Sequence, residues 1–144
     1  MNIKQALKLK KKLATKMNRE FGKVQSYNST EEGTKAPYSA KESLQNWLKM
    51  GNELVDLKTK IHKANAPVYD KIFRMSELKS QLTFIKSLDC TDGKHYDRYS
   101  SRESAINKVA EISLLERDEM ITSMEEEIEQ LQEELDHHNA TTSI

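Results

Sequence analysis

The sequence predicts a mainly α-helical protein, an antiparallel coiled coil or helical bundle of about four helices in a single domain over residues 1–144. Three observations favour this class. Charged residues make up 32% of the chain and aromatic residues only 6%, with four Gly and two Pro, a balance typical of long solvated helices rather than a compact globule. Apolar residues recur at intervals of three and four, which is the spacing of one helix face. Ser39 and Glu42 form an S-x-x-E capping box, a signal for a helix start.

The first helix is expected over residues 2–25. Most of its apolar residues fall on one heptad stripe, interrupted by Lys10: Ile3, Leu7, Ala14, Met17, Phe21 and Val24. Leu9 and Leu13 widen this stripe, as in a helix of a coiled coil. Residues 26–38 are mostly polar and include Gly33 and Pro37, which predicts a loop.

Two further helices are expected over residues 40–64 and 67–88. Pro67 suits the first turn of the second of these helices, where its missing N–H group leaves no hydrogen bond unmade. Gly51 lies inside the apolar stripe of the helix expected over residues 40–64. A glycine there lowers helix stability by about 1 kcal/mol relative to Ala, and a close crossing with another helix would explain why a glycine is present. The second helix has an apolar stripe of Val68, Ile72, Met75, Leu78, Leu82 and Ile85. The short break between the two leaves a kink or an antiparallel hairpin open.

The last helix is expected over residues 111–138. Its heptad seam consists of Leu114, Arg117, Ile121, Met124, Ile128, Leu131, Leu135 and His138. The residues before it leave two alternatives. Ser100 and Glu103 form a second capping box, which favours a helix start near Ser101. The β-branched residues that follow favour a short β segment near residues 96–110 instead.

The two ends of the chain carry opposite charge. Residues 1–25 hold eight basic side chains against one acid, Glu20, and residues 111–136 hold eleven acidic ones against one base, Arg117. The simplest arrangement packs these two helices together, with Lys–Glu pairs at the rim that select partner and register. We therefore expect no nucleic-acid binding by the first helix. The chain also has more apolar seams than one slender bundle can cover, so we expect a homo-oligomer.

The composition also bears on location. Cys90 is the single cysteine, so no intrachain disulfide can form, which favours a reducing compartment. The chain lacks the roughly 18 consecutive apolar residues of a membrane span, and no apolar region of a signal peptide follows the N-terminal lysines. We therefore expect no membrane association and a cytoplasmic protein, in a bacterial cell or, for a phage gene, in its host.

The sequence offers no catalytic constellation, and we expect neither an enzyme nor a cofactor. Cys90 lacks a partner base, and no glycine-rich loop is present to cradle a phosphate. His137 and His138 point to different sides of a helix, so we expect them to be solvated helix-end residues rather than metal ligands. The segment Asp89-Cys90-Thr91-Asp92-Gly93 has the wrong spacing for a calcium loop. No metal site is expected.

One segment does suggest a ligand site. Residues 94–102 combine cationic, aromatic and hydroxyl side chains between two helices. Guanidinium groups suit phosphate, tyrosine rings suit stacking on a base, and hydroxyls and a helix N-terminus suit phosphate oxygens. The candidate ligand-binding residues are Lys94, Tyr96, Arg98, Tyr99, Ser100, Ser101 and Arg102. The alternative is an ordinary polar loop that docks on the acidic last helix.

Four short pieces of sequence carry a family resemblance. They are Ile3-Lys4-Gln5-Ala6-Leu7, the stretch from Ile61 to Asn65-Ala66, Arg98-Tyr99-Ser100 followed by Glu103, and the closing Glu134-Leu135-Asp136 with Asn139, Thr142 and Ile144. With these pieces the chain resembles the septicolysin-like family of short bacterial and phage coiled-coil proteins of unknown activity. The resemblance implies a helical core with an extended piece after the Arg-Tyr-Ser motif, which supports the β alternative for residues 103–112.

These observations lead to the hypothesis of a non-enzymatic, oligomeric helical binding protein. In its most concrete form the oligomer is a phage anti-defence sponge, which sequesters a small anionic nucleotide signal through the loop at residues 94–102. The alternative is a structural or adaptor coiled coil with a protein partner and no small ligand. The first hypothesis predicts that nucleotide binding needs Arg98 and Arg102, and the second that function needs seam residues such as Leu131.

Overall fold

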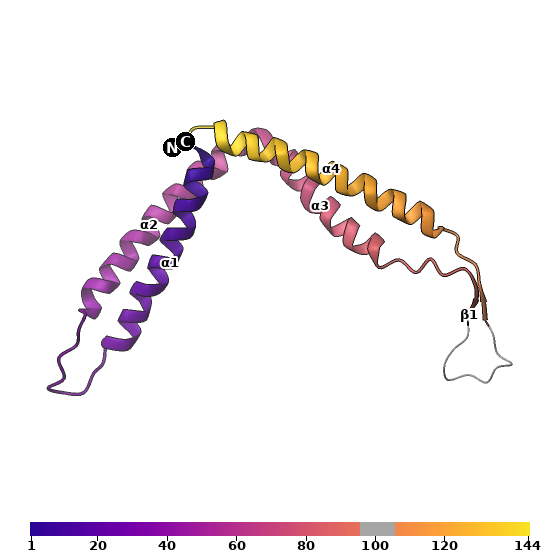
Figure 1. Ribbon diagram of the computed structural model, residues 1–144. Coiled ribbons are helices and arrows are strands. Elements are labelled where there is room, and N and C mark those ends of the chain that lie inside the picture. Colours follow the sequence, from indigo (N-terminus) through magenta and orange to yellow (C-terminus); the bar gives the residue numbers. More distant parts are fainter. Residues whose placement is uncertain (96–105) are drawn as a thin grey trace. The chain divides into compact units, whose positions relative to one another are not determined.

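The computed structural model describes residues 1–95 and 106–144. Of these residues 74% are helical, in four α-helices and one short 3-10 helix, and the described part also contains a small antiparallel sheet of two strands (Figure 1). The predicted class, a mainly α-helical bundle with a short β segment, is confirmed. No helix of the described part is long and apolar enough to cross a lipid bilayer.

Contacts divide the chain into two compact units. Unit 1 consists of Met1–Tyr69 and Asp136–Ile144, and unit 2 consists of Asp70–Leu135. The single domain and the homo-oligomer expected from the sequence stay predictions.

Unit 1 is built on an antiparallel hairpin of two helices, α1 (Ile3–Tyr27) and α2 (Ala40–Ala64), which lie side by side (Figure 1). The bounds expected from the sequence agree with these to within two residues. The rings of Phe21 and Trp47 lie against each other across the hairpin, with 5.6 Å between their centroids. This aromatic contact joins α1 and α2 in the half of the hairpin nearer the connecting loop.

Both helices begin where side chains satisfy backbone N–H groups of the first turn. At α1 the Asn2 side chain accepts from the N–H of Gln5 at 2.8 Å, and the Gln5 side chain accepts from the N–H of Asn2 at 3.0 Å. At α2 the hydroxyl of Ser39 accepts from the N–H of Glu42 at 3.3 Å. The second start is the one that the S-x-x-E motif predicts.

The hydrophobic core of unit 1 lies at the end of the hairpin where α1 begins and α2 ends. Ile3 and Ala6 of α1 are fully buried, and they pack against Leu57 and Ile61 of α2. The side chain of Ile144 packs on the same cluster. This core therefore joins three segments that are far apart in the sequence.

The two ends of the chain are also joined through their backbones. The N–H of Ile3 donates to the carbonyl oxygen of Thr142 at 3.1 Å, and the N–H of Ile144 donates to the carbonyl oxygen of Met1 at 2.8 Å. The N- and C-terminal residues consequently lie side by side (Figure 1). Ile3 is thus held by its side chain in the core and by its backbone against the C-terminal segment.

The buried side of α1 differs from the predicted stripe. Ala6 and Leu13 are buried, whereas Leu7 and Phe21, which the stripe places on the seam, are 36% and 41% exposed. The predicted stripe and the actual buried side share Ile3, Met17 and Val24. Adjacent residues point about 100° apart around a helix, so the predicted stripe and the buried side are related by a rotation about the axis of α1. Which of the two sides is buried depends on where the partner helix, α2, packs.

Gly51 of α2 faces Met17 of α1, in agreement with a helix crossing at this point. A Cβ atom at position 51 would lie 3.8 Å from the Met17 Cε, an ordinary van der Waals distance, so the crossing does not require glycine.

We expect Gly51→Ala to raise the free energy of unfolding by about 1 kcal/mol, because alanine is the better helix former. Thermal denaturation followed by circular dichroism measures the change. Gly22→Ala on α1, where a Cβ would meet nothing within 4 Å, is the matched control and should give a similar gain. A loss of stability at position 51 alone would contradict the prediction.

The long helices of unit 2 are α3 (Tyr69–Lys86) and α4 (Leu114–Thr141), apart from the terminal residues that belong to unit 1. Pro67, expected in the first turn of the third helix, lies instead in a short 3-10 helix, η1 (Ala66–Val68), directly before α3. Leu78 of α3 is 2% exposed and Leu135 of α4 is 6% exposed, both at predicted seam positions. Leu114, also expected on the seam of α4, is instead 53% exposed.

The strands of the small sheet are β1 (Gly93–His95) and β2 (Ile106–Lys108), paired antiparallel with Gly93 opposite Lys108. Residues 106–108 therefore form a strand, as the β alternative predicts, and not the first turns of the last helix; the helix start expected near Ser101 falls outside the described residues. Gly93 has a φ of +92°, a conformation that glycine adopts without strain.

A capping box marks the start of α4, formed by Ser113 and Glu116, which match the S-x-x-E motif in the sequence. The hydroxyl of Ser113 accepts from the N–H of Glu116 at 3.1 Å, and the carboxylate of Glu116 accepts from the N–H of Ser113 at 3.2 Å. The motif at Ser100 and Glu103, which we used to predict a start, lies outside the described residues. The S-x-x-E motif thus occurs at Ser100 and again at Ser113, and α4 begins directly after Ser113.

Candidate functional site

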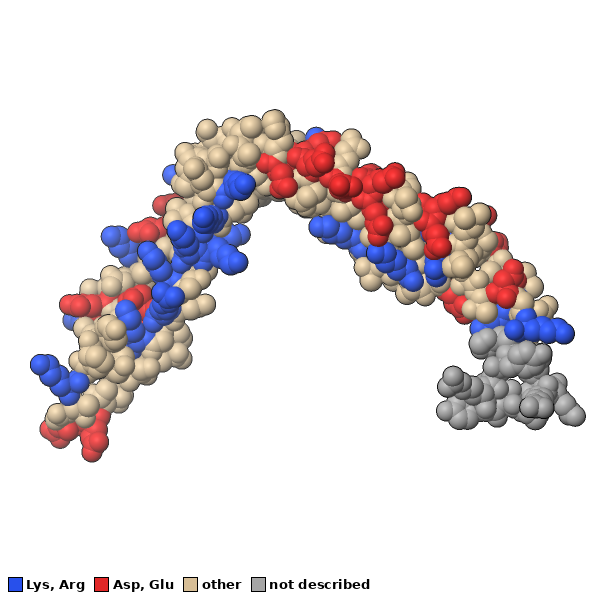
Figure 2. Space-filling model, in the orientation of Figure 1, with Lys and Arg blue, Asp and Glu red and all other residues tan. Residues whose placement is uncertain are grey.

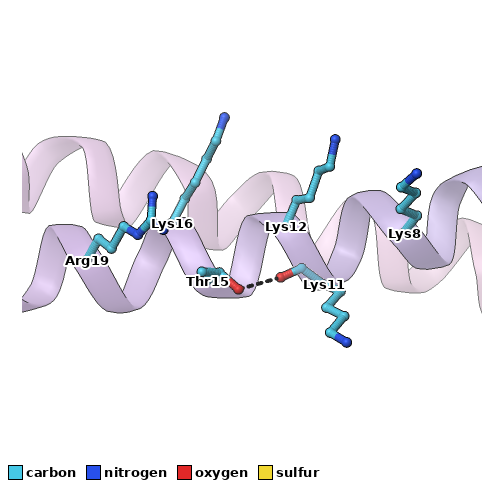
Figure 3. Close-up of a pocket in the computed structure, with 6 residues that line it drawn as sticks. All are labelled: Lys8, Lys11, Lys12, Thr15, Lys16 and Arg19. Carbon is cyan, nitrogen blue, oxygen red and sulfur yellow. Dashed lines mark hydrogen bonds between the residues drawn. The ribbon is translucent and has the colours of Figure 1, made fainter.

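The outer surface of α1 carries a row of cationic side chains. A shallow, open pocket on this surface is lined by Lys8, Lys11, Lys12, Thr15, Lys16 and Arg19 (Figure 3). We call these six residues the basic face of α1. All six are exposed, because packing on α2 buries the opposite side of the helix, which includes Ala6 and Leu13.

Three lysines of the basic face point to the same side of α1 (Figure 3). Lys8, Lys12 and Lys16 are four residues apart, so neighbours are about 6 Å apart along the axis and the whole face spans about 16 Å. The hydroxyl of Thr15 donates to the backbone oxygen of Lys11 at 3.1 Å. A linear row of this length can contact several phosphate groups of one ligand at once.

The cations of the basic face show no acidic partner among the described residues; the ion pair formed on α1 joins Lys23 and Glu20, beyond the face. Unit 1 as a whole contains fourteen Lys and Arg against seven Asp and Glu, a formal net charge of +7. Blue side chains accordingly gather along the α1–α2 hairpin in Figure 2. Charges of one sign grouped in this way create a positive potential that attracts anions.

Charge is balanced at the other end of α1, next to the loop. The Lys23 Nζ donates to the Glu20 Oε1 at 2.7 Å and lies 4.5 Å from the centroid of the Tyr38 ring. This hydrogen bond raises the pKa of Lys23 and lowers the pKa of Glu20, whose carboxylate also takes hydrogen bonds from Ser43 and Asn46 of α2. These groups tie the two helices together and are not part of the basic face.

The ligand site predicted from the sequence lies mostly outside the described residues. Those outside are Tyr96, Arg98, Tyr99, Ser100, Ser101 and Arg102. Lys94 is described, and it is exposed in β1 opposite Asn107 of β2. Close in sequence to β1, hydrogen bonds from the hydroxyl and N–H of Thr91 and from Lys108 lower the pKa of Asp89 to about 2. The predicted role of this loop in ligand binding stays a prediction.

The acidic stretch of α4 pairs with α3. The Arg74 guanidinium donates to both carboxylate oxygens of Glu127, at 2.9 Å and 3.1 Å. Lys71 forms a second ion pair with Glu134, and this hydrogen bond lowers the pKa of Glu134. The predicted pairing of the first and last helices along their seams is wrong, because the buried side of α1, which includes Ala6 and Leu13, packs on α2.

The adjacent histidines of α4 have different surroundings. His137 is exposed, but His138 is half-buried rather than solvated. The His138 Nε2 lies 3.2 Å from the carbonyl oxygen of Ala64, and its Nδ1 lies 3.1 Å from the hydroxyl of Thr142. With Nε2–H donating to the carbonyl, Nδ1 accepts from the hydroxyl, so the ring links the end of α2 to the end of α4 by hydrogen bonds. Across residues 1–95 and 106–144, no group of three or more His, Cys, Asp or Glu side chains is placed to hold a metal ion.

The sequence contains a signal for the basic face that we interpreted differently. Lysines at positions 4, 8, 12 and 16 recur every four residues, which places them on one side of a helix. We assigned them to ion pairs with the last helix. The structure instead leaves the basic face exposed, because α2 covers the other side of α1.

No protein-family model matches the chain, and no curated protein or solved structure matches it either. The resemblance to the septicolysin-like family therefore stays a prediction. The features of the described residues that bear on function are therefore the geometry and charge of the basic face.

Proposed function

We propose that the chain is a non-enzymatic helical protein that binds a phosphate-bearing anionic ligand through the basic face of α1. The observation that carries this proposal is the row of solvent-facing cations without acidic partners among the described residues. Ammonium and guanidinium groups form strong, charge-assisted hydrogen bonds with phosphate oxygens. Their shared positive potential also raises the local concentration of an anionic ligand.

Two sources of phosphate fit this chemistry, a nucleic-acid strand and a free nucleotide. The linear shape of the face favours a strand, because consecutive lysines can contact consecutive phosphates without reading the bases. The basic face contains no aromatic side chain on which a base could stack, so its contacts with a strand would be to the phosphates and not to the bases. A free nucleotide is the ligand of the anti-defence sponge hypothesis, which depends on Arg98 and Arg102 outside the described residues.

The test is fluorescence anisotropy with a labelled single-stranded oligothymidylate, titrated at several salt concentrations. We expect Lys8→Gln combined with Lys12→Gln and Lys16→Gln to weaken binding about tenfold or more at low salt. If all three lysines contact phosphates, the slope of log affinity against log salt should become shallower by about 2. Glutamine has a helix propensity close to that of lysine, so α1 should keep its structure.

A matched control removes the same charge from the same unit without touching the basic face. Lys41, Lys49 and Lys60 are exposed on α2, and their combined replacement by Gln should leave most of the affinity. Equal losses in the two triple variants would show that only net charge matters, which would overturn the basic face as the site.

Competition with ATP and with a cyclic dinucleotide distinguishes the two sources of phosphate. A nucleotide that binds the chain without displacing the oligothymidylate, and whose binding is lost when Arg98→Ala is combined with Arg102→Ala, would favour the sponge. Binding of the strand without the nucleotides would favour nucleic acid. If neither kind of ligand binds, the proposed function is wrong.

A further inference from the structure

The outer surface of α4 is the acidic counterpart of the basic face. A shallow hollow on it is lined by Leu115, Asp118, Glu119, Thr122, Ser123 and Glu126, and Glu129 and Glu133 are exposed further along the helix. We call Glu119, Glu126, Glu129 and Glu133 the acidic face of α4. Figure 2 shows red side chains along this helix.

The charges of the two units are equal and opposite. Unit 2 contains nine Lys and Arg against sixteen Asp and Glu, a formal net charge of −7, and unit 1 carries +7. The four glutamates of the acidic face are not among the acids that pair with α3 in the described part of the chain. The acidic face spans about 21 Å and the basic face about 16 Å along their helices, so the two rows have similar lengths.

We propose that the basic face of α1 in one copy docks on the acidic face of α4 in a second copy. A second copy fits because each chain holds both complementary surfaces, and because its formal net charge of zero leaves no long-range repulsion between copies. Each surface also has an exposed leucine to bury, Leu9 at 43% on α1 and Leu115 at 69% on α4.

This inference does not rest on phosphate binding, although both use α1. A second copy and a phosphate-bearing ligand would compete for the same lysines. Self-association is therefore measured without any phosphate, and oligothymidylate binding is measured separately, so that each proposal can fail without the other.

The first measurement is sedimentation velocity of the full chain in a phosphate-free buffer. We expect particles of at least twice the chain mass of 16.6 kDa at low salt. Raising the salt from about 0.1 M to about 1 M shortens the range of electrostatic attraction from about 10 Å to about 3 Å, and this should shift the protein to monomers. A chain that is monomeric at low salt, or an assembly that ignores salt, overturns the proposal.

A charge swap provides the decisive test. One variant carries Lys8→Glu, Lys12→Glu and Lys16→Glu, and the other carries Glu119→Lys, Glu126→Lys and Glu133→Lys. Each variant alone has two faces of the same sign and should sediment as a monomer. Mixed in equal amounts, they again offer opposite faces and should form a hetero-association.

Circular dichroism checks that both charge-swap variants keep the helix content of the unchanged protein; lysine and glutamate have similar helix propensities. A control with Lys49→Glu and Lys60→Glu on α2 should stay associated. Single variants that still self-associate, or a folded mixture that stays monomeric, would show that these two faces do not meet.

Discussion

Replacing Ile3 by Ala should lower the free energy of unfolding by about 2–5 kcal/mol, the usual range for a buried isoleucine. Ile3 is fully buried and packs with Ala6, Leu57 and Ile61 where the two helices of the hairpin meet. Its backbone N–H also donates to the carbonyl oxygen of Thr142. The backbone at position 3 is therefore held in place and cannot move far to close the cavity that the smaller alanine leaves. A cavity that cannot collapse costs both the lost burial and the lost contacts.

Urea denaturation followed by circular dichroism measures the effect of Ile3→Ala. Val55→Ala is the control, since Val55 lies on α2 and is 62% exposed; such surface changes stay within about 0.5 kcal/mol. If Ile3→Ala costs no more than Val55→Ala, the core at this end of unit 1 is not what holds the hairpin together.

Helix bounds could be predicted well from the sequence because the signals that start and stop helices are local. The Ser39 hydroxyl accepts from the N–H of Glu42 at the start of α2, and Pro67 lies in η1 at the break between two helices. Such interactions depend on a few neighbouring residues and not on the rest of the fold. The start of α4 is likewise marked by a local cap, the Ser113 side chain. The sequence contains two S-x-x-E motifs within residues 100–116, so the motif alone did not identify which of them precedes the helix.

The buried side of α1 could not be chosen in the same way, because it includes an acidic residue where the neighbouring stripe has an aromatic one, Phe21. Glu20 is half-buried, and it is held by Lys23 and by Ser43 across the hairpin. Counting apolar residues therefore favours the neighbouring stripe through Leu7 instead. Which stripe is buried depends on the helix that covers it, and that is not local information.

The charges of the candidate site could be predicted from the sequence, but their pairing partners could not. Opposite charges at the two ends of the chain predict attraction, but attraction alone does not say whether the partners belong to one chain or to two. In the structure α2 covers α1, and cations of α3 such as Arg74 take some of the acids of α4. The lysine row is thus visible in the sequence, but its exposure depends on how the hairpin packs.

Replacing Leu78 by Ala should have a comparably large effect on unit 2. Leu78 is 2% exposed at the predicted seam of α3, so its truncation should cost about 2–5 kcal/mol. Local amide protection in α3 and in the part of α4 within unit 2 should fall with it, because protection follows the free energy of opening. Hydrogen exchange measured by mass spectrometry gives this change segment by segment.

Phe84→Ala on the same helix separates burial from mere hydrophobicity. Phe84 is a larger apolar side chain than Leu78 but is 81% exposed, so its removal takes little apolar surface out of the folded core, and the hydrophobic contribution scales with the area buried. We therefore expect Phe84→Ala to be nearly neutral in the same exchange experiment. If the two substitutions cost the same, then Phe84 is covered in solution by something other than α3 and α4, and the seam through Leu78 is not the principal support of this unit. If only Leu78→Ala is costly, the heptad pattern read from the sequence identifies the stabilising residues of unit 2, including those that face α4.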